Sequence, residues 1–313
     1  WLLDSPVAGP QQTRIAYETQ GMTWWADYSA IYDEEKGCSM DLSGWVSIIN
    51  QSGASFEDAK LKLIAGDVNR AERPNQRRDM VMKMAMAAES DAGFAEKAFF
   101  EYHMYTLGRP ADLPDNSTKQ LQLFPTARGV KCDKELVIAP TMGMNRHGYH
   151  QLDHDYGRYG NADINVYLRF RNEEKNGLGM PLPAGRFRVM QRDSADDSLE
   201  FIGEDVIDHT PRNEDLLIEM GNAFDIVGER KQTDFRIDTR TRNMWETFEI
   251  RLRNHKDDAV TVTVLENLYR AANWTIEGSS HDWDKENSNR IRFDMKVPAE
   301  GEAVITYTAH YTW

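Results

Sequence analysis

Short runs in which apolar and polar residues alternate, separated by glycine and proline, restrict most strongly how this chain can fold. In the stretch Asn172–Asp225, the segment Gly177–Gly185 reads Gly-Leu-Gly-Met-Pro-Leu-Pro-Ala-Gly, and strand-like runs follow it. Proline cannot donate a backbone hydrogen bond and glycine weakens a strand, so both residues mark strand ends and turns. Runs of this length with such boundaries are typical of antiparallel β proteins.

The period of two is clearest in the second half of the chain. Apolar residues alternate with charged residues or threonine in Thr247–Arg253 and Val260–Val264, and the pattern returns in Arg290–Val297 and Val304–Tyr311. Such alternation indicates strands with one buried and one solvated face. Roughly fifteen strand-like runs at short spacing predict an all-β protein of antiparallel β-sandwich architecture.

The first half carries the same signals with two interruptions. Strands are expected at Thr13–Thr19, Thr23–Tyr32, Ser39–Ile49, Asp58–Ala65, Phe99–Leu107, Thr118–Phe124 and Val130–Ile138. The segment 71–97 is rich in Arg, Ala, Met and Glu and is expected to be a short helical or mobile insertion. The His- and Gly-rich segment 140–160 is expected to be a long loop. We therefore predict two packed sandwich-like halves, residues 1–139 and 161–313, on either side of that loop.

Charge and hydrophobicity exclude some classes of partner. The chain has 37 Lys and Arg against 51 Asp and Glu, a formal net charge of −14, which would repel the phosphates of nucleic acid. It contains no apolar run of the ~18 residues that a membrane-spanning helix needs. Cys38 and Cys132 are compatible with one disulfide or with two buried thiols. Because the sequence begins without methionine, we expect a fragment or a processed protein.

Several glycines are expected to hold turns rather than ligands. Gly177, Gly179 and Gly221 lie in turn-like segments, where backbone angles closed to other residues are common. The motifs around them therefore need no chemical explanation.

A series of motifs in chain order is similar to one known family. The motifs are Gly21–Tyr28, Ile48–Gly53, Phe56–Leu63, Glu101–Tyr105, Asp115–Gln120, Leu178–Gly185, Phe201–Asp205, Asn273–Ile276 and Thr306–Tyr311. Together they resemble the conserved bacterial domain of unknown function of mucoidy-inhibitor-A-like proteins. The resemblance implies a β-sheet protein that is periplasmic or extracellular, associated with the cell envelope, and it supplies no catalytic residues. Many relatives also have an N-terminal domain and a coiled coil.

One segment could bind a ligand or a metal ion. Within nine residues it contains His147, His150, His154 and Asp155, and imidazole and carboxylate groups are common ligands of transition metals. The neighbouring glycines indicate a loop, in which these residues would be equally at home as ordinary polar surface groups. We keep both interpretations, with the surface loop preferred.

A second segment contains closely spaced methionines. On a strand, Met82 and Met84 would lie on one face together with Met80 and Met86, and thioethers suit Cu(I). On a helix the same residues would spread around the axis and fill gaps in a core. The second interpretation is preferred.

The sequence contains none of the common catalytic or phosphate-binding motifs. We therefore expect a secreted or envelope-associated binding or assembly module that uses a protein partner or self-association, without enzymatic activity or a resident cofactor. The alternative is a metal-dependent enzyme or copper-handling protein that uses the 147–155 loop. A carbohydrate-binding module, which would need an exposed Trp, is a third hypothesis.

Overall fold

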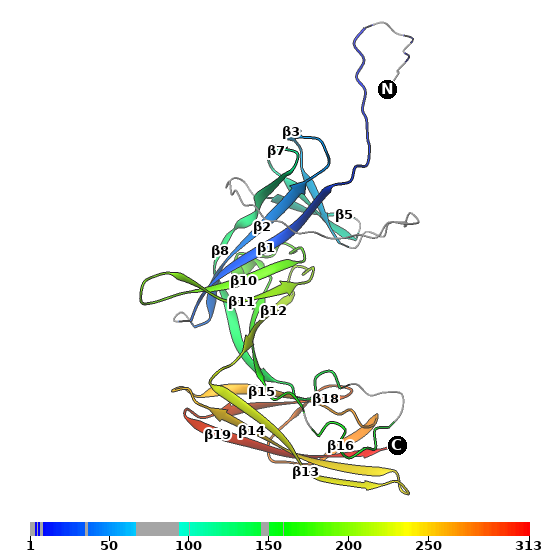
Figure 1. Cartoon of the computed structure of the whole chain (residues 1–313), viewed down its shortest axis with the longest axis vertical. Helices are drawn as coiled ribbons and strands as arrows, with labels where there is room; N and C mark the ends of the chain where they lie inside the picture. Colours follow the sequence, from blue (N-terminus) through cyan, green and yellow to red (C-terminus); the bar gives the residue numbers. More distant parts are fainter. Residues whose placement is uncertain are drawn as a thin grey trace. The chain divides into compact units, whose positions relative to one another are not determined.

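A computed structural model describes residues 4, 6, 9–34, 37–66, 94–99, 101–144, 150–158 and 160–313. These residues form β-strands and a single 3-10 turn, Glu174–Asn176 (Figure 1). The predicted all-β fold of antiparallel sheets is confirmed. Most of the expected insertion at 71–97 lies outside the described residues, and its end belongs to β5 (Phe94–Phe99).

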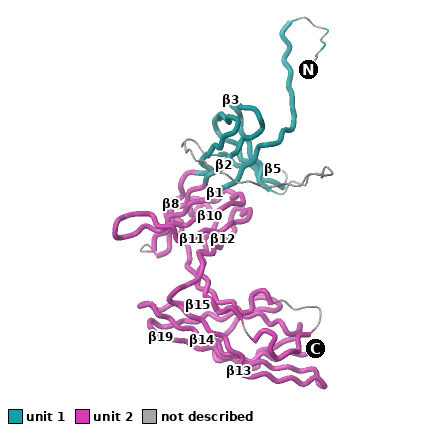
Figure 2. Tube along the Cα trace, viewed as in Figure 1, with its two compact units in different colours: residues 1–26, 45–124 teal, residues 27–44, 125–313 magenta. Residues whose placement is uncertain are grey.

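The chain divides into two compact units, residues 1–26 with 45–124 and residues 27–44 with 125–313 (Figure 2). Three long strands, β1 (Met22–Asp33), β2 (Ser39–Asn50) and β8 (Ser117–Ile138), contribute residues to both units. The two strands expected at 118–124 and 130–138 are thus one continuous strand, β8.

The first unit contains two small sheets. In one, β3 (Phe56–Ala59) pairs with β7 (Ala111–Leu113); in the other, β6 (Tyr102–Leu107) lies between β4 (Lys62–Ala65) and β5. The strand expected at 13–19 does not form. Ile15 and Tyr17 in this segment are 53% and 71% exposed, so the alternating pattern there has no apolar surface to cover.

The second unit contains the remaining strands. They are β9 (Ile164–Arg171), β10 (Gly185–Arg192), β11 (Leu199–Ile207), β12 (Asp215–Asn222), β13 (Ile226–Asp238), β14 (Asn243–Asn254), β15 (Val260–Asn267), β16 (Asn273–Ser279), β17 (Asp284–Asn287), β18 (Arg290–Val297) and β19 (Gly301–Thr312). The large sheet runs β11-β10-β1-β2-β8-β15-β18-β17, and β9 pairs with both β8 and β12. A smaller sheet runs β13-β14-β19-β16. The pairing of β15 with β8 is parallel.

The two cysteines form a disulfide within the second unit. Cys38 lies in the turn between β1 and β2, and Cys132 lies on β8, 94 residues further along the chain. The backbone N–H of Cys132 also donates to the carbonyl of Cys38 at 3.1 Å. The disulfide therefore fastens this turn to β8, one of the two arrangements that the sequence allowed.

The core of the C-terminal sandwich comes from two layers, β13-β14-β19-β16 and the end of the large sheet with β15 and β18. Alternate residues of each strand are buried, as their patterns predict: Phe248, Ile250 and Leu252 on β14 meet Val262 and the other apolar residues of the opposite layer. At 25 cal/mol per Å² of buried apolar surface, such side chains are the main stabilising element of the sandwich.

Three glycines have the backbone angles expected from their turn-like surroundings. The φ angles of Gly177, Gly179 and Gly221 are 72°, 96° and 99°, in the region that favours glycine. At Gly179 a Cβ would also lie 2.8 Å from the Glu174 side chain. The structural explanation of these motif glycines is confirmed.

Candidate functional site

A buried ion pair joins the two layers of the C-terminal sandwich. Arg230 on β13 and Glu266 on β15 have side chains that are 1% and 0% exposed. The Nε of Arg230 donates to Glu266 Oε1 at 2.9 Å, and its Nη2 donates to Oε2 at 2.9 Å. The Tyr307 hydroxyl adds a bond of 2.6 Å to Oε2. Both oxygens of Glu266 are thus satisfied, which offsets the large desolvation cost of a buried charge.

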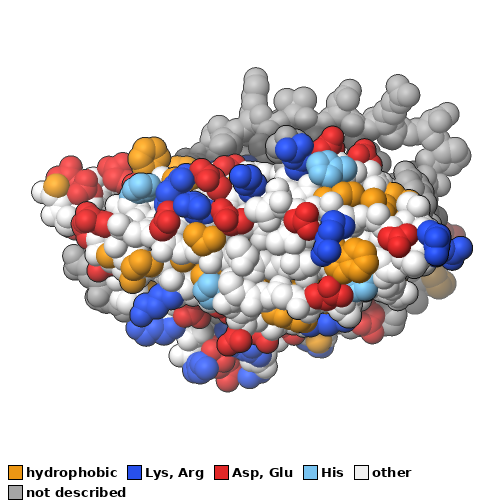
Figure 3. All heavy atoms as spheres, turned by 90° about the horizontal axis from the view of Figure 1, so that it is seen from below, with side chains coloured by type: hydrophobic (Ala, Val, Ile, Leu, Met, Phe, Trp, Pro, Cys, Tyr) orange, Lys and Arg blue, Asp and Glu red, His pale blue; other side chains and the backbone are white. Residues whose placement is uncertain are grey.

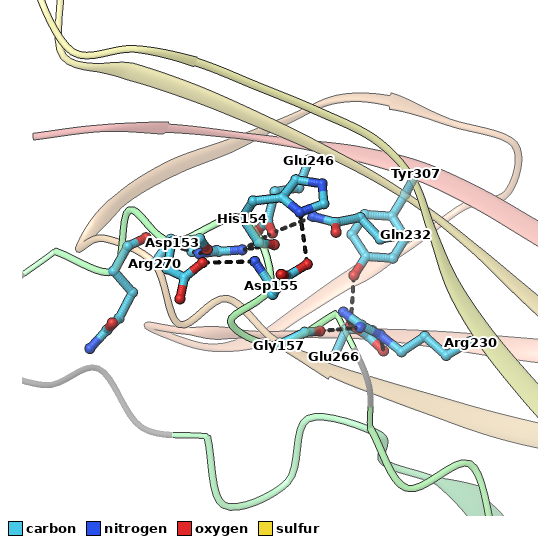
Figure 4. Close-up of polar contacts among 11 residues, drawn as sticks. Asp153, His154, Asp155, Gly157, Arg230, Gln232, Glu246, Glu266, Arg270 and Tyr307 are labelled. Atoms are coloured by element: carbon cyan, nitrogen blue, oxygen red, sulfur yellow. Dashed lines mark hydrogen bonds and ion pairs between the residues drawn. The ribbon is translucent and has the colours of Figure 1, made fainter.

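A second buried pair lies in the same network (Figure 4). Arg270 and Glu246 are both fully buried, and the Arg270 Nη2 donates to Glu246 Oε1 at 2.6 Å. The Gln232 Nε2 donates to the same oxygen at 3.1 Å. Burial raises the pKa of the Glu246 carboxyl, although the hydrogen bond and the charge of Arg270 oppose this rise. The pair therefore holds a carboxyl group in surroundings that disfavour its charge.

The two guanidinium groups hold the loop that the sequence marked as a candidate site. Arg270 Nη1 donates to the carbonyls of Gln151 and Asp153, and Arg230 Nη1 donates to the carbonyl of Gly157 at 2.8 Å. These bonds reach backbone atoms, so they fix the path of the loop whatever its side chains are. The arginines therefore act as an internal anchor for residues 151–157.

Gly157 is required where the loop meets the sandwich. Its φ is 74°, and a Cβ at this position would lie 1.9 Å from the hydroxyl of Tyr269. Burial raises the pKa of that hydroxyl. A neutral phenol thus packs directly on the loop backbone.

The predicted ligands on this loop point outward. His154 and Asp155 are 53% and 67% exposed, and the His154 Nδ1 lies 2.9 Å from the Asp155 Oδ1. The hydrogen bonds from His154 and Arg158 lower the pKa of Asp155. His150 is exposed and lies beside Trp313, with ring centroids 5.9 Å apart. His154 and Asp155 are thus brought together, as their adjacent positions require.

A metal centre is not visible in the part of the chain that the structure describes. Within it, no three His, Cys, Asp or Glu side chains are grouped so that they could hold a metal ion. His147, Met82 and Met84 lie outside the described residues. The metal-binding hypothesis therefore stays a prediction. Among the described residues, no helix is long and apolar enough to cross a membrane.

Sequence reasoning missed the four buried titratable residues of these two ion pairs, although the pattern contains a signal for three of them. Glu246 falls in the phase of Phe248 on β14, and Glu266 falls in the phase of Val264 on β15. Arg230 falls in the phase of Ile226 on β13. A charged residue in the inward phase of a strand indicates a buried partner of opposite charge.

A different surface feature lies where β12 leads into β13. The Phe224 side chain is 95% exposed, yet the backbone on either side of it is fixed. The Ala223 N–H donates to Ile164 at 2.7 Å, and the His255 N–H donates to Asp225 at 2.8 Å. The phenyl ring is therefore exposed to solvent on a loop whose backbone is held by hydrogen bonds.

Further exposed apolar side chains lie on the neighbouring strands β11 and β12. They are Leu199, Phe201, Val206 and Leu217. The strands run close together, because the Asp205 Oδ2 accepts the N–H of Glu219 at 2.8 Å and a Cβ on Gly203 would touch Met220. Elsewhere, the face seen in Figure 3 mixes basic and acidic side chains with scattered hydrophobic ones. We refer to Leu199, Phe201, Val206, Leu217 and Phe224 as the β11–β12 surface.

The comparison with protein families identifies the chain. Residues 13–313 match the model of a family described as a domain of unknown function, DUF4139, and the chain belongs to this family. Neither the curated proteins nor the solved structures include a match.

Proposed function

We propose that the chain is an exported binding and assembly module of the mucoidy-inhibitor-A-like kind, acting in the periplasm or outside the cell. The observation that carries this proposal is the β11–β12 surface, and above all Phe224, whose ring is 95% exposed on a hydrogen-bonded loop. Exposed apolar side chains mark contact sites of proteins, and aromatic anchors dominate their binding energy.

The disulfide supports the compartment. Disulfides persist in secreted and periplasmic proteins and are rare where thiols are kept reduced. The Cys38–Cys132 bridge is largely shielded from solvent. Cys132 is 7% exposed on its strand, and its backbone N–H donates to the carbonyl of Cys38. A structural bridge of this kind fits an oxidising environment.

Strand addition at β13 is disfavoured as the mode of self-association. This edge strand has an inward-pointing Arg230, a register shift between Gln232 and Asp234, and alternating charges on its outer face. Inward charges and bulges are devices that prevent edge-to-edge pairing. Contacts through side chains of the β11–β12 surface are therefore the favoured mode, with another copy of the chain as the partner to test first.

The surroundings of the tryptophans give carbohydrate binding no comparable support. Each Trp in the described residues is at least partly buried. Trp245 stacks on His310 with ring centroids 4.6 Å apart, and the guanidinium of Arg236 lies 5.4 Å from the Trp245 ring centroid. These neighbours occupy the ring that a sugar would need.

Sedimentation velocity at micromolar concentration tests the proposal. We expect wild-type protein to form dimers or larger species. The double variant Phe201→Asp/Phe224→Asp should be monomeric, because a carboxylate in place of each phenyl ring makes burial of this surface costly. Met142→Asp, a change of the same type at a side chain 66% exposed elsewhere, is the control and should associate as wild type does. A wild-type protein that stays monomeric, or a double variant that associates equally well, contradicts self-association through this surface.

A further inference from the structure

The two buried glutamates of the sandwich differ in how their oxygens are used. Both oxygens of Glu266 accept hydrogen bonds, from Arg230 and Tyr307. On Glu246, both bonds from donors go to Oε1, and Oε2 is buried without a partner. A carboxylate offers two equivalent oxygens, whereas a carboxylic acid has one carbonyl oxygen that accepts and one hydroxyl that donates.

The neighbours of Glu246 reinforce this difference. The Nε of Arg270 and the hydroxyl of Tyr269 are buried donors without partners in the same network. Neither of them donates to Glu246 Oε2.

Gln232 supplies the acceptor that a hydroxyl on Glu246 requires. Its Nε2 donates to Glu246 Oε1 at 3.1 Å, and its own Oε1 is buried without a donor. An amide and a carboxylic acid pair through two bonds, N–H to the carbonyl oxygen and O–H to the amide oxygen. One of these bonds is present, and the two remaining oxygens, Glu246 Oε2 and Gln232 Oε1, are both buried without a donor.

We propose that Glu246 is a proton-binding site: it carries a proton on Oε2, which it donates to Gln232 Oε1, while Oε1 accepts from Arg270 and Gln232. A single proton satisfies two buried acceptors that otherwise lack a donor, and unsatisfied buried acceptors are costly. Arg270 keeps its bonds to the loop carbonyls in this state.

The charges that face Glu246 come from each element packed around it. Arg270 follows β15, Arg230 lies on β13 and Glu266 on β15, while the phenols of Tyr269 and Tyr311 also face it. The two arginines favour the carboxylate, and Glu266 and burial favour the acid. Burial is the largest of these effects and raises the pKa of Glu246, which agrees with the hydrogen-bond pattern.

The sign of the pH dependence follows from this direction. A carboxyl whose pKa is higher in the folded state adds stability that is fully present below its unfolded pKa and is lost as pH rises through the folded pKa. Between the unfolded pKa and the folded pKa, the folding equilibrium constant of the wild type decreases about tenfold per pH unit through this group. The Glu246→Gln variant keeps the donor and acceptor pattern of the acid and has no proton to lose.

Two measurements on the full chain test the proposal. In urea unfolding at a series of pH values, Glu246→Gln should match wild type at the acid end and exceed it progressively as pH rises. Glu266→Gln is the matched control and should be less stable at every pH, because both oxygens of Glu266 accept. A Glu246→Gln protein that is less stable than wild type throughout would overturn the proposal.

Infrared spectroscopy of wild-type protein decides the question even if the variants fail to fold. At a pH where exposed carboxyls are ionised, we expect the carbonyl band of a protonated carboxylic acid. Its absence at every pH at which the protein is folded and exposed carboxyls are ionised would show an ionised Glu246 and refute the proposal.

Discussion

Removing the disulfide should destabilise the second unit by several kcal/mol. Cys38 and Cys132 are separated by 94 residues, so their bond closes a long loop in the unfolded chain. The chain-entropy relation for a loop of this length gives a stabilisation of about 4.7 kcal/mol at 25 °C. The double variant Cys38→Ala/Cys132→Ala removes the bridge without leaving a reactive thiol.

Urea unfolding followed by tryptophan fluorescence measures this effect. The free energy of unfolding of the double variant should lie about 4.7 kcal/mol below that of oxidised wild type. Reduced wild-type protein is the matched control and should fall by a similar amount, since it keeps both side chains and loses only the bond. If the oxidised, reduced and substituted proteins agree within about 1 kcal/mol, the bridge does not restrict the unfolded chain as this reasoning requires.

Two further predictions concern the loop. Arg270→Met should lower the free energy of unfolding by about 3 kcal/mol, because the buried Glu246 carboxyl and the part-buried carbonyls of Gln151 and Asp153 lose their donor at about 1–3 kcal/mol each. Amide hydrogen exchange at 151–157 should also accelerate. Arg158→Met, at an exposed ion pair, is the control and should change little. If the loop binds a metal, protein purified without chelator should contain close to one transition-metal ion per chain and lose it in His147→Ala/His150→Ala; unchanged metal content in the variant would exclude the loop.

Much of the fold follows from period-two patterns, and the exceptions have physical reasons. The runs in β14, β15, β18 and β19 predicted strands with one buried face, and the structure has them. The same pattern at 13–19 forms no strand, because alternation specifies a strand only where a sheet edge and an apolar surface are available.

The candidate site was harder to predict from sequence. The loop was recognised from its histidines, but the groups that hold it are Arg230 and Arg270, more than seventy residues away in the chain. Their role depends on which residues meet across two layers, and periodicity within one strand does not contain that information. The inward phases of Arg230, Glu246 and Glu266 were the available signal, and they indicate buried partners without identifying them.

The groups that hold the loop in place are different from the side chains that were predicted to bind a ligand. Arg230 and Arg270 bind backbone carbonyls, and Gly157 is needed for its lack of a side chain. His154 and Asp155 contact each other, and they also contact the Phe235 ring and Arg158 respectively. Exposed ion pairs of this kind contribute little to stability. Substitutions at these two residues should therefore leave the fold intact, so any loss of binding that they cause can be attributed to the side chains themselves.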